Sequence, residues 1–149
     1  MTTTESHVPV FDTTLQTTHH WLRELELIAS LRNESEAYSV LRAVLHTLRD
    51  RLTPDEAVNL AAELPMLVRG FYYENWKPSV TPKILRTLAE FLREIPLLPH
   101  PDETFDAEKA VRSVFLMLDH RVSAGEIHDV RHMLPQEVRS LWPEYAAAH

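Results

Sequence analysis

Residues 41–76 read LRAVLHTLRDRLTPDEAVNLAAELPMLVRGFYYENW, and residues 110–142 read AVRSVFLMLDHRVSAGEIHDVRHMLPQEVRSLW. The two stretches align without a gap when the chain is shifted by 70 positions against itself. Identical residues at this offset include the following pairs: Leu22 and Leu92, Arg42 and Arg112, Arg51 and Arg121, Glu56 and Glu126, Leu64 and Leu134, Pro65 and Pro135, and Arg69 and Arg139. One constant offset over such a length indicates an internal repeat. We therefore predict two copies of one unit, residues 10–76 and 80–146, packed as a single domain behind a flexible N-terminus of residues 1–9.

The apolar residues of each copy recur at the spacing of an amphipathic helix. The central helix of each unit is marked by Leu41, Val44, Leu45, Leu48 and Leu52 in the first copy, and by Val111, Val114, Phe115, Leu118 and Val122 in the second. The 2 glycines of the chain are too few for the tight turns of a sheet protein. We predict an all-α fold, a tandem duplication with about four helices in each unit and about eight in one globular protein.

Short signals predict where several helices begin and end. Thr53 and Ser123 are each followed three residues later by a glutamate, which predicts a capping box at the start of a helix. Pro65 and Pro135 should end these helices and precede a short fourth one, because proline has no amide to donate. The first helix of the second copy should begin at residues 81–82, where a threonine precedes a proline.

The composition disfavours several classes of partner. The net charge of -7 and the pI near 5.7 remove the attraction that drives binding to nucleic acid or to anionic membranes. Cysteine is absent, which excludes disulfides, thiolate nucleophiles and cysteine-ligated metals. No export signal marks the N-terminus, and no apolar run approaches the roughly 18 residues of a membrane helix. We expect a cytoplasmic protein that binds neither nucleic acid nor membrane and has no cofactor.

The first of the two quoted stretches resembles the hallmark segment of a bacterial family known as domain of unknown function 2267, and the second resembles the other half of that pattern. The most specific part is the break at Leu64 and Pro65, followed by an arginine and aromatic residues. The resemblance covers nearly the whole chain. It implies a small helical bacterial protein, and it brings no known activity and no catalytic residues with it.

Arginine recurs at equivalent positions of the two copies, which favours a structural use. Such arginines form bidentate pairs with carboxylates or stack on aromatic rings. Expected carboxylate partners are Glu24, Glu56, Glu94 and Glu126. The functional alternative is a clamp for an anion or a phosphate group, with Arg69 and Arg139 as candidate binding residues.

None of the 9 histidines recurs at the offset, so the fold does not require them. His128 and His132 are four positions apart on one predicted helix and are the candidate metal ligands, with His120 or Asp129 as a further ligand. They fall opposite the apolar side of that helix. The alternative is therefore a pair of solvated surface histidines.

Aromatic residues end both copies. The candidate binding residues among them are Tyr72, Tyr73, Trp76, Trp142 and Tyr145. Tyrosine and tryptophan suit ligand grooves and oligomer contacts because they combine apolar area with a polar tip. The alternative is that they fill the seam between the two units. The helix expected at residues 54–63 is apolar nearly all round, so the other unit or a second chain should cover it as well as its own unit.

No recognisable catalytic signature is present, and the sequence leaves open whether the protein is an enzyme. The favoured function is a protein-interaction or self-association module, with a protein partner or a second copy forming a homodimer. The alternative is a small-molecule or metal-binding protein, which could be an enzyme, that uses histidines near the cleft between the units. Nucleic-acid binding through the arginines is disfavoured by the acidic charge.

Overall fold

The computed structural model describes residues 8–84, 86–95 and 106–143. Within these ranges the chain forms eight α-helices, one short 3-10 helix and no strand, so the all-α prediction is confirmed. The α-helices are α1 (Pro9–Ala29), α2 (Glu34–Arg49), α3 (Pro54–Ala61), α4 (Met66–Tyr73), α5 (Leu88–Arg93), α6 (Ala107–Arg121), α7 (Ala124–His132) and α8 (Gln136–Arg139), and the 3-10 helix is η1 (Pro78–Val80).

The limits of α3, α4, α7 and α8 follow from short-range signals. Thr53 and Ser123 occupy the N-cap positions of α3 and α7, where each hydroxyl accepts a hydrogen bond from the third amide after it, at 3.3 Å in both cases. Pro65 and Pro135 occupy the N-cap positions of α4 and α8. Because proline cannot donate to the preceding turn, each ends the helix before it. The predicted breaks at both prolines are confirmed.

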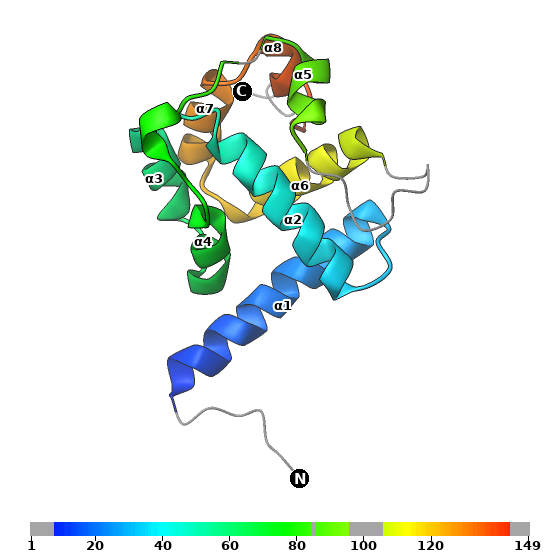
Figure 1. Cartoon of the computed structure of the whole chain (residues 1–149). Coiled ribbons are helices and arrows are strands. Elements are labelled where there is room, and N and C mark those ends of the chain that lie inside the picture. Colours follow the sequence, from blue (N-terminus) through cyan, green and yellow to red (C-terminus); the bar gives the residue numbers. More distant parts are fainter. Residues whose placement is uncertain (1–7, 85, 96–105, 144–149) are drawn as a thin grey trace.

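The core lies around α2 and α6, the central helices of the two halves (Figure 1). Fully buried side chains of these helices include Leu41, Leu45, Leu48, Phe115, Met117 and Leu118. α1 packs on both central helices, α3 packs on α7, and α5 packs on α8. Helices of one half therefore contact helices of the other, and the buried apolar residues form one cluster.

Only the C-terminal half of α1 is buried. Its buried residues are Trp21, Leu22, Leu25 and Ala29, whereas its first half projects beyond the other helices (Figure 1). Of the N-terminus expected to be flexible, residues 1–7 lie outside the described residues, and Pro9 begins α1.

The start of the second half differs from the prediction. Thr87 caps α5, and its hydroxyl accepts a hydrogen bond from the amide of Glu90 at 3.1 Å. Residues 81–82, where this helix was expected to begin, are joined by a cis peptide bond and are not helical. The amide of Lys83 instead donates to the carbonyl of Asp50 at 2.7 Å. A tertiary contact with the end of α2 therefore takes the place of the expected helical turn.

Two ion pairs between the halves are related by the 70-residue offset. Arg51 donates to Glu94 at 3.1 Å, and the equivalent positions form the pair of Arg121 with Glu24. Such reciprocity, in which position i contacts j and the equivalent of i contacts the equivalent of j, is typical of units related by a two-fold axis. It agrees with a duplicated unit, and the duplication itself stays a prediction.

Candidate functional site

Acidic side chains meet where α3 packs on α7. Glu56 and Glu126 lie in the first turns of these helices, and Asp129 lies three residues further along α7. One carboxylate oxygen from each of the three lies within 4.8 Å of the other two. Glu56 is 7% exposed and Glu126 is 8% exposed, whereas Asp129 is exposed to solvent. We name these three residues the acidic cluster.

Burial and like charge act together on the acidic cluster. The Oε2 atoms of Glu56 and Glu126 are buried and receive no hydrogen bond from the described part of the chain. Burial, and after it the neighbouring Glu56, raises the pKa of Glu126 to about 8. Two negative charges no more than 4.8 Å apart repel each other by about 3.5 kcal/mol or more at an effective dielectric constant of about 20. A proton or a cation would offset this repulsion.

Glu63 brings a fourth carboxylate to the start of α7. Its two oxygens accept hydrogen bonds from the amide and the hydroxyl of Ser123, both at 2.7 Å. The capping box predicted for Ser123 is therefore only half correct: its hydroxyl binds the amide of Glu126, but its own amide is bound by Glu63 rather than by Glu126. At the equivalent place in the first half, the Thr53 hydroxyl lies 3.8 Å from the sulfur of Met133.

Two of the four carboxylates expected to pair with arginine do so. Glu24 and Glu94 form the reciprocal ion pairs between the halves. For Glu56 and Glu126 the expectation is wrong within the described residues, because these two carboxylates lie against each other where α3 meets α7. Only the packing of the two helices, which no local signal shows, brings them together.

The two arginines proposed as an anion clamp bind backbone carbonyls. Arg69 donates to the carbonyl of Ala61, the last residue of α3, at 3.0 Å, and to that of Leu64, beyond its end, at 2.9 Å. Arg139 donates to the carbonyl of Leu134 at 3.0 Å, beyond the end of α7. The carbonyls of Leu64 and Leu134 lie beyond the ends of these helices, and the two guanidinium groups supply donors to them.

The aromatic residues that end the first half pack within that half. Tyr72 is fully buried, and its hydroxyl donates to the carbonyl of Ala57 at 2.8 Å. Tyr73 lies between Tyr72 and Trp76, with ring centres 5.3 Å and 5.4 Å away. These contacts join α4 to α3 and to the segment after α4.

In the second half, Trp142 stacks on Phe115 with ring centres 4.0 Å apart. Trp142 is buried, so its indole fills space beside the central helix α6. Tyr145, the last of the candidate aromatic residues, lies outside the described residues.

The candidate metal ligands His128 and His132 lie side by side on α7, with ring centres 4.1 Å apart. Nδ1 of His132 donates to the carbonyl of His128 at 3.0 Å, which leaves Nε2 as the nitrogen able to bind a metal. His120, named as a further ligand, instead contacts Glu24 at 3.3 Å. Asp129 belongs to the acidic cluster. Metal binding by the histidine pair stays a prediction.

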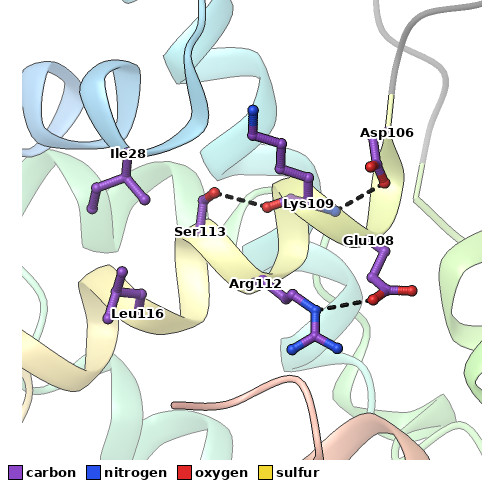
Figure 2. A pocket seen from close by; sticks show the side chains of 7 residues that line it. All are labelled: Ile28, Asp106, Glu108, Lys109, Arg112, Ser113 and Leu116. Atoms are coloured by element: carbon purple, nitrogen blue, oxygen red, sulfur yellow. Dashed lines mark hydrogen bonds and ion pairs between the residues drawn. The ribbon is translucent and has the colours of Figure 1, made fainter.

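A solvent-open hollow of about 360 Å³ lies between α6 and Ile28 of α1 (Figure 2). Two of its polar side chains are engaged within α6: Arg112 donates to Glu108 at 2.9 Å, and the Ser113 hydroxyl donates to the carbonyl of Lys109 at 2.8 Å. Figure 2 shows the Lys109 amine and the Arg112 guanidinium extending in opposite directions. The hollow therefore lacks the convergent polar groups of a small-molecule site.

The projecting half of α1 carries an apolar face. Val10, Phe11 and Leu15 are 47%, 51% and 43% exposed. At 100° per residue Phe11 and Leu15 lie about 20° from the buried Leu22, and Val10 lies about 20° from the buried Trp21, so one apolar stripe runs from the covered half into the exposed half. We name residues 8–20 the α1 overhang. In the sequence, this overhang is marked by apolar residues that continue the stripe of α1 toward the N-terminus, beyond the part that packs on the core.

Comparison with known proteins places the chain in a family. No helix in the described ranges combines the length and apolar character needed to cross a lipid bilayer. A comparison with curated proteins finds no match. Residues 18–141 match the family model described as Uncharacterized conserved protein (DUF2267), which confirms the resemblance found in the sequence. Because this match spans well over half of the chain, the protein belongs to the DUF2267 family.

Proposed function

We propose that this protein is a self-associating helical module that forms a homodimer through the α1 overhang. The observation that supports this is the continuous apolar stripe of α1, which is buried at Leu22 and exposed at Phe11 and Leu15. Burying exposed apolar surface is favourable by about 25 cal/mol per Å². The apolar stripe extends beyond the helices that cover its C-terminal part. A second helix packed along the exposed part would bury Phe11 and Leu15.

A second copy of the chain is the occupant that fits this face. A two-fold interface uses the same patch on both subunits, so the patch must be self-complementary. Asp12 and His19 are seven positions apart on one flank of the stripe. Antiparallel pairing of two overhangs brings Asp12 of each copy beside His19 of the other, and the His19 side chain remains 54% exposed although it contacts Glu34. A carboxylate and an imidazole thus meet beside the apolar contact, and they form an ion pair when His19 is protonated.

The size of the overhang sets the strength of the dimer. The twelve helical residues of the overhang, 9–20, span about 18 Å. Stable interfaces bury about 1,200 Å² or more in total, and two helical segments of this length cover less than that, which places the contact among the weak, transient interfaces. The dimer should therefore dissociate on dilution.

The test is sedimentation velocity of the full chain over a concentration series. Wild type should shift from monomer to dimer as concentration rises. The double variant Phe11→Asp/Leu15→Asp should stay monomeric because it places charge in the stripe. Leu27→Asp is the matched control, since Leu27 lies on the opposite side of α1 and is 81% exposed. It should dimerise like wild type, and all three proteins should show similar melting temperatures at concentrations where wild type is monomeric.

Three results would contradict the proposal. Wild type that remains monomeric throughout the series shows that the overhang does not self-associate. Dimers that persist in the double variant show that another surface is used. A monomeric wild type that binds a different purified protein through Phe11 and Leu15 identifies a hetero-interaction module instead.

A further inference from the structure

We propose that the acidic cluster of Glu56, Glu126 and Asp129 binds one divalent cation of the oxygen-seeking class, Mg²⁺, Ca²⁺ or Mn²⁺, and that this ion joins α3 to α7. The site is remote from the α1 overhang in sequence and uses none of its residues. The proposed cation binding therefore does not depend on the proposed dimer. It differs from the histidine pair in ligand chemistry, because carboxylate oxygens suit these ions and imidazole suits zinc or nickel.

The spacing of the oxygens fits a single ion. Two oxygens bound to one Ca²⁺ at about 2.4 Å each lie no more than about 4.8 Å apart. The ligand atoms of Glu56, Glu126 and Asp129 all lie within 4.8 Å of one another. One ion can therefore bridge any two of these oxygens, and small rotations of the side chains would bring the third within bonding distance.

A separate observation, the unsatisfied oxygens, indicates that a positive partner belongs here. The side chains of Glu56 and Glu126 are more than nine-tenths buried, and an Oε2 atom of each receives no hydrogen bond from the described residues. Buried carboxylates in folded proteins are paired, hydrogen-bonded or bound to metal. Here the charged groups with the largest effect on Glu126 are themselves acidic, namely Glu56, Glu63 and Asp129. A divalent ion would compensate this concentration of negative charge.

The residues around the acidic cluster leave it open to solvent on one side and hold its two helices in place. Asp129 is exposed, so the third ligand lies at the solvent edge, where water can complete the coordination shell. Glu63 is held by the amide and hydroxyl of Ser123, which fixes the start of α7 beside the end of α3. The ligands thus come from two helices that capping interactions already hold in place.

The test compares thermal melts of the full chain after removal of metals with EDTA and dialysis. Melts are run near pH 8, with MgCl₂, CaCl₂ or MnCl₂, and with NaCl at matched ionic strength. At least one divalent cation should raise the melting temperature of wild type by several degrees, because an ion that binds only the native state stabilises it. Manganese binding is measured directly from the loss of the free Mn²⁺ signal in electron paramagnetic resonance.

Variants identify the ligands. Glu126→Gln keeps the shape of the side chain and removes one buried charge, so it should raise the melting temperature in EDTA and abolish the response to the cation. Asp129→Asn should weaken Mn²⁺ binding at least tenfold. Asp55→Asn is the matched control, because Asp55 is exposed, lies next to Glu56 on α3 and is not part of the cluster. It should respond to the cation like wild type.

Two outcomes overturn the proposal. If no divalent cation shifts the wild-type melt and Mn²⁺ stays free, while Glu126→Gln still stabilises the protein near pH 8, the two glutamates share a proton and hold no ion. If wild type and Glu126→Gln respond equally to the cation, the ion binds elsewhere on the protein.

Discussion

The hydroxyl of Tyr72 donates to the backbone carbonyl of Ala57 at 2.8 Å, and this bond ties α4 to α3 through a fully buried side chain. Burial raises the pKa of Tyr72 well above its ordinary value, so the phenol stays protonated and remains a donor at all physiological pH values. The contact links the aromatic end of the first half to the helix that carries Glu56.

Tyr72→Phe should lower the free energy of unfolding by about 1 kcal/mol, because it removes one buried hydrogen bond and keeps the ring. The measurement is urea denaturation followed by circular dichroism. Tyr73→Phe is the control, since no described contact involves the Tyr73 hydroxyl, and its midpoint should match wild type. Equal losses in the two variants would show that the Tyr72 bond adds nothing specific.

The bond between Glu63 and Ser123 should contribute to the packing of α3 against α7. Glu63→Ala leaves the Ser123 amide without its partner and should cost about 1 to 2 kcal/mol of unfolding free energy, in the range of a lost helix cap. Glu108→Ala is the comparison, because its pair with Arg112 is solvent-exposed and should be worth less than about 0.5 kcal/mol. Chemical denaturation of both variants measures the difference. A Glu63→Ala loss no larger than that of Glu108→Ala would contradict the assignment.

The two reciprocal ion pairs should differ in strength although they occupy equivalent positions. The Arg51 side chain is 2% exposed, and burial lowers its pKa, whereas Arg121 is 30% exposed. Glu94→Gln strands a buried cation and should cost about 2 kcal/mol, while Glu24→Gln should cost less than about 1 kcal/mol. Melting of the two variants at equal pH and salt tests this order. The reverse order would show that burial of the arginine does not decide the outcome.

His46 should make the stability depend on pH. Its Nε2 donates to the carbonyl of Phe71 at 2.6 Å. Burial, in spite of that bond, lowers the pKa of His46 from 6.5, and Arg49 and Arg42 lower it further. Since the folded pKa lies below the unfolded value, the unfolded chain takes up the proton first. The contribution of neutral His46 is therefore complete above about pH 6.5 and is lost as the pH falls through the folded pKa.

His46→Gln should remove this part of the pH dependence. The unfolding free energies of wild type and His46→Gln are compared between about pH 7.5 and pH 5, so that groups titrating in both proteins cancel. Wild type should lose more stability than the variant over this range. Parallel pH profiles would mean that His46 keeps its ordinary pKa in the folded protein.

Local signals account for the elements that were predicted correctly. Thr53 and Ser123 cap α3 and α7, and Pro65 ends α3, through interactions within a few residues of the chain. The expected helix start at residues 81–82 failed because Lys83 binds Asp50. A contact at that separation leaves no trace in the local pattern.

In the candidate site, too, local signals identify single residues but not the contacts between distant helices. The sequence shows Glu56 and Glu126 as equivalent glutamates, each three residues after a helix cap. From local rules and from the recurrent arginines, they were predicted to complete capping boxes and to pair with arginine. Ser123 shows why that assignment was incomplete, since its amide is bound by Glu63 from the other half. The apolar stripe of α1 is visible in the spacing of its residues. The sequence does not show at which residue the other helices stop covering that stripe.

The sequence by itself determined that this chain is helical, where α3, α4, α7 and α8 begin, and which side of the two central helices faces the core, because caps, prolines and helical periodicity act over one or two turns. Only the tertiary structure decided that Glu56 meets Glu126 and that the stripe ends exposed at Phe11. Both depend on the distance and angle between helices far apart in the chain. These are set by the packing of many side chains at once, and no short stretch of sequence contains them.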